Sequence, residues 1–428
     1  MSDDKTPTRS TSSDDLVADT TDAMNASDAH LRPRGSNQTG MRQYNERVVL
    51  QAIRLHGPTP KADLARLTHL STQTVSIIIN RLLEDELVLK LEPQRGKVGQ
   101  PSVPIALNPD GAFSIGIKIG RRGTDVLLVD FTGHVRQRHS FNYAFPDPHT
   151  VFAAIEQTIT SLHAGLGVLS SQLHGLGVAA PLSLGGWHTL LDLSAEQTRQ
   201  WDDVDIAGRI AAMTDLPVTF VKDTAAACVA ELVAGRGRSI QNYLYVFVST
   251  FVGGGLVLDS HLRPGWQGNA GALGSLSTRI STPSAGEKTN LPPQVLSTAS
   301  LFNLERRFTQ AGLDSAAIFD ERAVQGEWAA HTEAWLSDAA PAIALSIHSA
   351  ACLLDVEGVI IDGSFSRSLL QALLVHVSTA LDGYDWEGVS RPDILAGTIG
   401  SDARAIGGGL LPLYINFAPD QDLFLKLA

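Results

Sequence analysis

Four short polar side chains recur on one side of a segment with helical periodicity near the start of the chain. They are Thr72, Gln73, Ser76 and Asn80, and they lie opposite the apolar side chains of the same segment. Hydroxyl and amide groups can hydrogen-bond to base edges and phosphates, and Gln or Asn can bind adenine through two hydrogen bonds. We therefore predict a helix that reads the major groove of DNA. A solvated polar helix face is the alternative interpretation.

A glycine-rich basic loop follows this segment and carries Arg95, Lys97 and Gln100. Glycine lets a backbone approach a narrow groove, and arginine inserts into the narrow minor groove of A·T-rich DNA. An ordinary hairpin turn is the alternative interpretation. Because both features occur in one short stretch, we expect them to contact double-stranded DNA together.

The elements that must position these side chains follow the order of a winged helix-turn-helix. Apolar periodicity predicts helices over residues 43–56, 61–67 and 72–85. Ser71 is a suitable N-cap for the third helix. Strands are predicted on either side of the basic loop, over residues 88–91 and 103–107.

Charge separates this module from the rest of the chain. The protein has a net charge of −12, yet residues 41–108 hold nine Lys and Arg against six Asp and Glu. A positive segment in an acidic protein favours a small nucleic-acid-binding module on a larger body. We assign residues 41–110 to the DNA-binding domain. Residues 1–40 are rich in Ser, Thr, Asp and Asn, so we expect a disordered tail there.

Residues 111–428 alternate apolar strands and helices. Strands are predicted at 114–119, 125–130, 175–179, 218–221, 243–249, 254–258, 358–362 and 393–396. Helices are predicted at 151–165, 206–214, 224–233, 339–354, 366–381 and 402–414. Two α/β halves with glycine-rich turns predict a two-lobed α/β fold with a ligand cleft between the lobes.

Composition limits the kind of site and the compartment. The chain has two cysteines, Cys228 and Cys352, which excludes a disulfide framework and a Cys-rich zinc site and fits a reducing cytoplasm. Both cysteines lie in apolar helical segments and are predicted core residues. The sequence has no run of 18 apolar residues and no apolar signal segment near its start, so we expect no membrane span and no secretion.

Five segments, in order and spacing, carry a resemblance to a known family. They are Gly116–Gly120, Val221–Ala227, Gly253–Leu258, Arg263–Gly265 with Gly268–Gly271, and Gly397–Leu413. Residues 44–428 resemble the ROK family of repressors, open reading frames and sugar kinases. The resemblance implies an actin-like ATPase fold with a sugar in the interlobe cleft. The predicted winged helix-turn-helix makes the chain similar to the family's regulators.

The resemblance also implies an effector site. Asp223 matches the family's catalytic base, which in kinases takes the proton of a sugar hydroxyl. In a binding protein this carboxylate would accept a hydrogen bond from that hydroxyl, and capping of the following helix is an alternative role. Lys222 replaces a sugar-contacting Asn of the family. The candidate effector-binding residues are Lys222, Asp223, Gly268 and Asn269.

Several residues of this chain differ from the family residues that bind metal ions. Where family kinases carry an Asp that helps hold the magnesium of ATP, this chain has Lys118, followed by Arg121 and Arg122 in the phosphate turn. A divalent cation needs oxygen ligands, so we expect incomplete phosphoryl-transfer machinery and no catalysis.

The family's zinc motif and a second sugar-contacting carboxylate are also replaced. Ala272 and Ser275 stand where the family has Glu and His, and Leu296 stands near the position of a sugar-contacting Glu. No His pair frames a carboxylate in a metal-binding pattern. We expect no metal and no cofactor.

These observations predict a cytoplasmic DNA-binding transcriptional regulator, a repressor of sugar uptake or catabolism genes. A sugar or sugar derivative in the cleft would control its binding to a double-stranded DNA operator. We expect a homodimer or homotetramer, because one such module buries little DNA surface. An ATP-dependent sugar kinase with an accessory domain is one alternative, and a protein-interaction scaffold is another.

Overall fold

The structure, a computed structural model, describes residues 38–93, 102–186, 193–279 and 292–419. The described residues divide into two units, residues 38–47 with residue 419 and residues 48–418. The first unit contributes the start of helix α1 (Gln38–His56), where Arg42 pairs with Glu46 at 3.8 Å. The helix begins at Gln38 rather than at the predicted Gln43, because polar residues continue it beyond the apolar positions on which the prediction rests. Residues 38–40, assigned by sequence to a disordered tail, are therefore helical, and residues 1–37 lie outside the described part.

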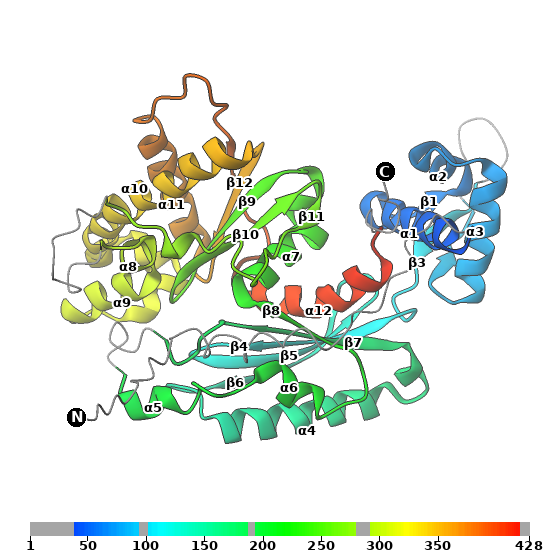
Figure 1. The fold of residues 1–428 in the computed structure, drawn as a ribbon, viewed down its shortest axis with the longest axis horizontal. Coiled ribbons are helices and arrows are strands. Elements are labelled where there is room, and N and C mark those ends of the chain that lie inside the picture. Colours follow the sequence, from blue (N-terminus) through cyan, green and yellow to red (C-terminus); the bar gives the residue numbers. More distant parts are fainter. Residues whose placement is uncertain (1–37, 94–101, 187–192, 280–291, 420–428) are drawn as a thin grey trace, which may run out of the picture. The chain divides into compact units, whose positions relative to one another are not determined.

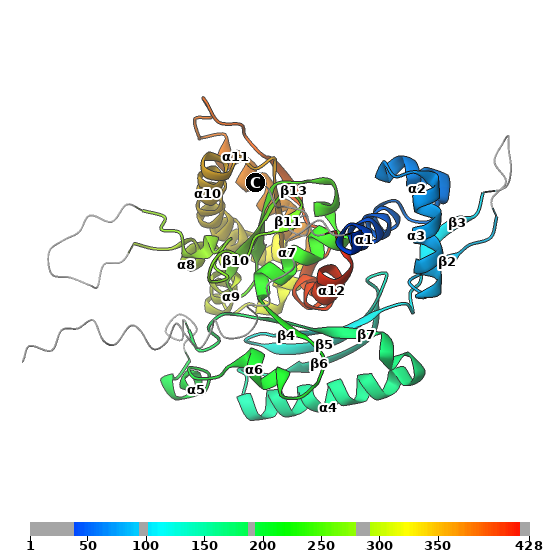
Figure 2. The same cartoon turned by 45° about the vertical axis from the view of Figure 1, so that its right-hand side comes forward.

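A helical module with a small antiparallel sheet follows within the second unit (Figure 2). Its elements after α1 are β1 (Thr59–Pro60), α2 (Lys61–Thr68), α3 (Thr72–Glu84), β2 (Val88–Lys90) and β3 (Pro104–Leu107), with the sheet order β1-β3-β2. Ser71 caps α3, since its Oγ accepts a hydrogen bond from the Thr74 N–H at 3.1 Å. Val75 and Ile79 of α3 are fully buried. The predicted order of helices and strands is confirmed, with β1 as an unpredicted addition.

The N-terminal lobe of the body is a five-stranded sheet with the order β6-β5-β4-β7-β8. Its elements are β4 (Phe113–Ile119), β5 (Gly123–Asp130), β6 (Val135–Asn142), α4 (Pro148–Leu166), β7 (Leu173–Ala180), α5 (Ala195–Arg199), α6 (Ile206–Ala211) and β8 (Val218–Lys222). β4, β5 and β6 form an antiparallel meander, and β7 and β8 run parallel to β4. Helices α4 and α6 lie on one face of this sheet (Figure 1).

The C-terminal lobe repeats this topology. Its elements are β9 (Tyr243–Val248), β10 (Val252–Leu258), β11 (His261–Leu262), α8 (Val295–Ala299), α9 (Leu301–Gln310), α10 (Ala329–Leu354), β12 (Gly358–Gly363), α11 (Arg367–Leu381) and β13 (Asp393–Ala396). The sheet order is β11-β10-β9-β12-β13, so both sheets place their strands in the order third, second, first, fourth and fifth. The sequence shows two α/β halves, and the structure reveals that they share one topology.

Helices α7 (Asp223–Ala234) and α12 (Ala403–Phe417) lie between the two sheets (Figure 1). They pack on each other, with α12 against β4 and β7 and α7 against β10. Glycine makes this close packing possible. A Cβ on Gly407 would overlap the carbonyl oxygen of Ala226, and one on Gly116 would overlap the backbone of Gly409.

Three differences from the predicted elements have physical causes. Strand β6 was missed because it is an edge strand with mostly exposed polar side chains, so it has no apolar alternation. The predicted start of helix α10 at residue 339 is wrong, because the helix begins at Ala329. Proline favours the first helical turn, but Pro341 lies in the interior of this helix. Cys228 is buried as predicted, but Cys352 is exposed, because the last turn of α10 is exposed.

One described segment, Gly326–Leu354, is long and apolar enough to cross a membrane by length and composition alone. Within the fold, 56% of its most apolar window is buried. Trp335, Ile343 and Ile347 of α10 are fully buried in the hydrophobic core of the C-terminal lobe. The helix therefore serves as a core helix of this lobe.

Candidate functional site: an interlobe cleft and a polar helix face

The main functional candidate is a cleft between the two lobes. It encloses about 910 Å³, part of it open to solvent. Lining residues directly follow the carboxyl ends of β4, β7, β8 and β9, where ligands of α/β folds bind. The lining comprises Gly120, Arg121, Pro181–Ser183, Lys222–Thr224, Ser249–Gly253, Asn269, Ala272, Gly274, Ser275, Leu296 and Arg404.

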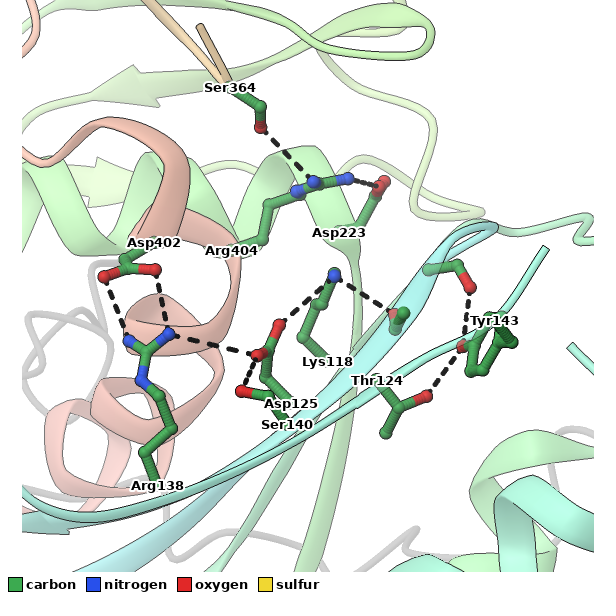
Figure 3. Close-up of polar contacts among 12 residues, drawn as sticks. Lys118, Thr124, Asp125, Arg138, Ser140, Tyr143, Asp223, Ser364, Asp402 and Arg404 are labelled. Atoms are coloured by element: carbon green, nitrogen blue, oxygen red, sulfur yellow. Dashed lines mark hydrogen bonds and ion pairs between the residues drawn. The ribbon is translucent and has the colours of Figure 1, made fainter. Parts of the chain in front are cut away.

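Asp223 lies at the first position of α7 and faces the cleft. Its Oδ1 accepts a hydrogen bond from the Thr224 N–H at 2.9 Å, and its Oδ2 lies 3.5 Å from Nη1 of Arg404 (Figure 3). The side chains of Asp223 and Arg404 are only 12% and 16% exposed. The carboxylate thus binds the start of the helix, although as its first residue rather than its N-cap, and also belongs to the cleft lining.

Arg404 is a cleft residue that the sequence interpretation missed. It comes from α12, and its Nη2 also donates a hydrogen bond to Ser364 Oγ at 3.3 Å. Its guanidinium lies over the ring of Phe247, 5.4 Å from the centroid. The sequence did offer one indication that Arg404 is a functional residue: it is the one Lys or Arg within residues 397–413.

Lys118 lies on β4 and is held by its own strand pair. Its Nζ donates hydrogen bonds to Gly123 O at 3.1 Å and to Asp125 Oδ2 at 3.2 Å (Figure 3). Burial and nearby Arg404 lower the pKa of Lys118, while Asp125 opposes this shift. Burial alone would raise the pKa of Asp125, but Lys118 and Ser140 outweigh it and lower the pKa of that carboxyl. The ammonium group of Lys118 therefore forms a partly buried ion pair with Asp125.

The two arginines of the β4–β5 turn both reach the C-terminal lobe. Arg121 donates to Ser183 O at 2.8 Å and lies over the Phe251 ring, 4.6 Å from its centroid. Burial lowers the pKa of Arg121 to about 10, with Asp223 opposing this shift. Arg122 binds both carboxylate oxygens of Glu305 in α9, at 2.7 and 2.5 Å. Of this pair of arginines, only Arg121 lines the cleft.

The candidate effector residues predicted from sequence separate into two groups. Lys222, Asp223 and Asn269 line the cleft, whereas Gly268 neighbours Asn269 in the chain but is not part of the lining. Within the described ranges, no group lies within hydrogen-bond or ion-pair distance of Lys222 Nζ. Burial lowers the pKa of Lys222, and Asp223 opposes this shift.

Three further positions that depart from the family pattern lie in the cleft lining. Ala272, Ser275 and Leu296 contribute apolar or weakly polar surface there. In the part of the chain that the structure describes, no group of three or more His, Cys, Asp and Glu side chains is arranged to hold a metal ion.

The predicted DNA-reading residues lie on one side of α3. Thr72, Gln73 and Asn80 are exposed, and Ser76 is half-buried. Lys61 of α2, which the sequence interpretation did not select, donates from Nζ to Asn80 Oδ1 at 3.3 Å. A cation therefore lies beside the polar face of α3. Arg95, Lys97 and Gln100 of the basic loop lie outside the described residues.

Comparison with known proteins relates these features to a family. The family description "ROK family" matches residues 114–412, and "Winged helix-turn-helix DNA-binding" matches residues 42–88. The xylose repressor of Bacillus spizizenii is 24% identical over 257 residues, which are 58% of this chain and 64% of that protein.

Solved structures show the same fold. A ROK family transcriptional regulator, described as a homologue of the E. coli MLC protein, has a TM-score of 0.63 at 18% identity and covers 90% of this chain and 98% of its own. The ROK hexokinase of Thermus thermophilus has a TM-score of 0.52 at 21% identity and covers 71% of this chain and 98% of its own. The predicted two-lobed fold is thereby confirmed. Because the family match extends over most of the chain, this protein belongs to the ROK family.

Proposed function

We propose that this protein is a DNA-binding transcriptional repressor of sugar uptake or catabolism genes. Its effector is a sugar or sugar derivative bound in the interlobe cleft. The observation that carries the proposal is the exposed polar face of α3, placed in a winged helix-turn-helix ahead of a ROK body. The repressor names of curated relatives and the ROK regulator among similar structures support the same assignment.

In this proposal α3 enters the major groove. Gln73 is exposed near the start of α3 and reads a base edge. Lys61 lies beside Asn80 at 3.3 Å and neutralises a phosphate once α3 is docked. The basic loop contributes Arg95, Lys97 and Gln100 to the minor groove, as its composition predicts. The protein acts in the cytoplasm, as a homodimer or homotetramer that binds repeated half-sites.

The cleft supports binding rather than phosphoryl transfer. Magnesium needs oxygen ligands, but Lys118 puts an ammonium group at the family's metal position and engages Asp125 at 3.2 Å. The residues present therefore do not fit a magnesium ion. Asp223 lies 3.5 Å from Arg404, so one of its oxygens faces a cation rather than a substrate hydroxyl. We infer that the body is not an enzyme.

A sugar kinase with an accessory domain is the second candidate, and Asp223 at the position of the family's catalytic base favours it. A coupled ADP-release assay over a panel of sugars separates the two candidates. We expect no turnover. Sugar-dependent ADP release that is lost in Asp223→Ala would establish the kinase.

The direct test of the regulator is selection of bound DNA from a random pool by the full-length protein. We expect enrichment of a repeated half-site and its release by a member of a sugar and polyol panel. Recovery of no preferred sequence would contradict the proposal. It would favour a protein-interaction scaffold.

A further inference from the structure

The charge of the cleft is opposite to that of the protein. The chain carries a net charge of −12. Among the described residues, three cations line the cleft, Arg121, Lys222 and Arg404, against one carboxylate, Asp223. Cations confined in a partly closed cleft act strongly on a ligand, because low-dielectric walls focus their field.

The one carboxylate of the lining is already engaged. Asp223 receives the Thr224 N–H at 2.9 Å and faces Arg404 Nη1 at 3.5 Å. A neutral sugar offers hydroxyl groups that need acceptors as well as donors. Apart from Asp223, the acceptors that the lining offers are hydroxyl, amide and backbone groups, and Ala272 and Leu296 add apolar surface.

The donors, in contrast, are in excess. Lys222 Nζ has no hydrogen-bond or ion-pair partner among the described residues. The Nε atoms of Arg121 and Arg404 are buried, again without a partner in the described ranges. Lys and Arg side chains donate hydrogen bonds and accept none, and the partial burial of three cations around a single carboxylate is costly. Burial lowers the pKa of both Lys222 and Arg121, as expected for cations held with too little negative charge nearby.

We propose that the cleft binds an anionic carbohydrate, a sugar phosphate or a sugar acid, with Lys222 as the main contact to its negative group. This rests on the proposed function, because it names the effector class of the same cleft. Arg121 and Arg404 provide the surrounding positive field. The sugar hydroxyls contact the polar groups of the lining, such as Asn269.

The test is isothermal titration calorimetry on the full-length protein with matched pairs of probes. The pairs are glucose with glucose 6-phosphate, glucose with gluconate, and xylose with xylonate. Inorganic phosphate is the control for an anion without a sugar, and ATP is the control for a more highly charged nucleotide. We expect at least one anion to bind about tenfold or more tightly than its neutral partner, the ratio expected for one charge-assisted hydrogen bond.

Variants at Lys222 locate the contact. Lys222→Gln should weaken binding of the anion about tenfold more than binding of the neutral partner, whereas Lys222→Arg should retain the preference. The control Arg236→Gln removes one exposed charge just beyond the other end of α7 and should change neither. The phosphate and carboxylate pairs distinguish the two sources of the negative group.

Several outcomes overturn the inference. They are equal or tighter binding of the neutral partners, no binding by any anionic sugar, tighter binding of ATP or inorganic phosphate, or no effect of Lys222→Gln. Operator binding is measured on the same preparations. If the protein binds an anionic sugar but no specific DNA, the regulator proposal is refuted and the anion site is retained. If the protein binds specific DNA and a neutral sugar releases it, the anion site is refuted and the regulator proposal is retained.

Discussion

The ion pair between Arg122, in the β4–β5 turn, and Glu305, in α9, joins the two lobes of the body. Two parallel hydrogen bonds of 2.7 and 2.5 Å make it bidentate, and hydrogen bonding to Glu305 raises the pKa of Arg122. Glu305 is 13% exposed but Arg122 is 53% exposed, so solvent screens part of the attraction. We place the coupling at about 1 kcal/mol, the upper end for exposed pairs.

A double-mutant cycle measures this coupling. Arg122→Gln, Glu305→Gln and the double variant are compared with the parent protein by urea unfolding at low ionic strength. We expect the double variant to lose less stability than the two single variants together, by about 1 kcal/mol, and the difference to shrink at high salt. Arg322→Gln is the control, because Arg322 pairs with Asp314 and Asp320 inside the C-terminal lobe.

The same pair tests whether the lobes are held together by side chains. Small-angle X-ray scattering of Arg122→Gln should give a larger radius of gyration than Arg322→Gln, because only the former removes an interlobe contact. Strict additivity in the cycle, together with equal radii of the two variants, would refute the reasoning.

Four further predictions concern single residues. Gln73→Ala should relax base preference at one position of the selected DNA sequence by about 1–3 kcal/mol, and an unchanged preferred sequence would show that α3 presents a different face. Glu231 is fully buried and accepts backbone N–H bonds from Arg236, Thr398 and Ile399, so Glu231→Gln should lower the free energy of unfolding by about 3 kcal/mol or more, and a loss under 1 kcal/mol would contradict this. Gly407→Ala should cost about 1–3 kcal/mol because its Cβ overlaps the Ala226 carbonyl, while the control Gly383→Ala, whose Cβ would lie 3.4 Å from its nearest neighbour, should change stability little. Although burial lowers the pKa of His376, its 2.9 Å contact with Glu333 outweighs burial and raises it, so this pair stabilises the fold where the imidazole is protonated and the carboxyl group is ionised, and the contribution is lost as the pH rises through the raised pKa of His376; thermal melts of the parent and Glu333→Gln should differ most between about pH 5 and 6.5 and converge at higher pH.

The DNA-binding module was predictable because its signals are local. The apolar spacing of α3 and the cap at Ser71 depend on residues within a few positions of each other, and both are present in the structure. The same reasoning failed at β6, because an exposed edge strand lacks the alternation that marks a half-buried one. It also failed at the start of α10, where Pro341 is tolerated in the helix interior.

The site was predictable only in part. Lys222, Asp223 and Asn269 belong to segments that resemble the family, and all three line the cleft. Arg404 was not selected, because nothing near it in the sequence indicates that it faces a residue 181 positions away. Contacts of this kind depend on how α12 packs against α7.

The sequence by itself determined the order of the modules, the positive charge of the DNA-binding segment and the residue types at the cleft. These properties follow from composition, periodicity and capping, which act over a few residues. Tertiary structure alone decided which charges are neutralised. Arg122 meets Glu305 183 residues away, Lys118 meets Asp125 across a strand pair, and Lys222 Nζ lies within ion-pair distance of no carboxylate among the described residues. The physical reason is that Coulomb interactions depend on distance and burial in the folded chain, and these depend on strand pairing and on the packing of α7 and α12 between the two sheets.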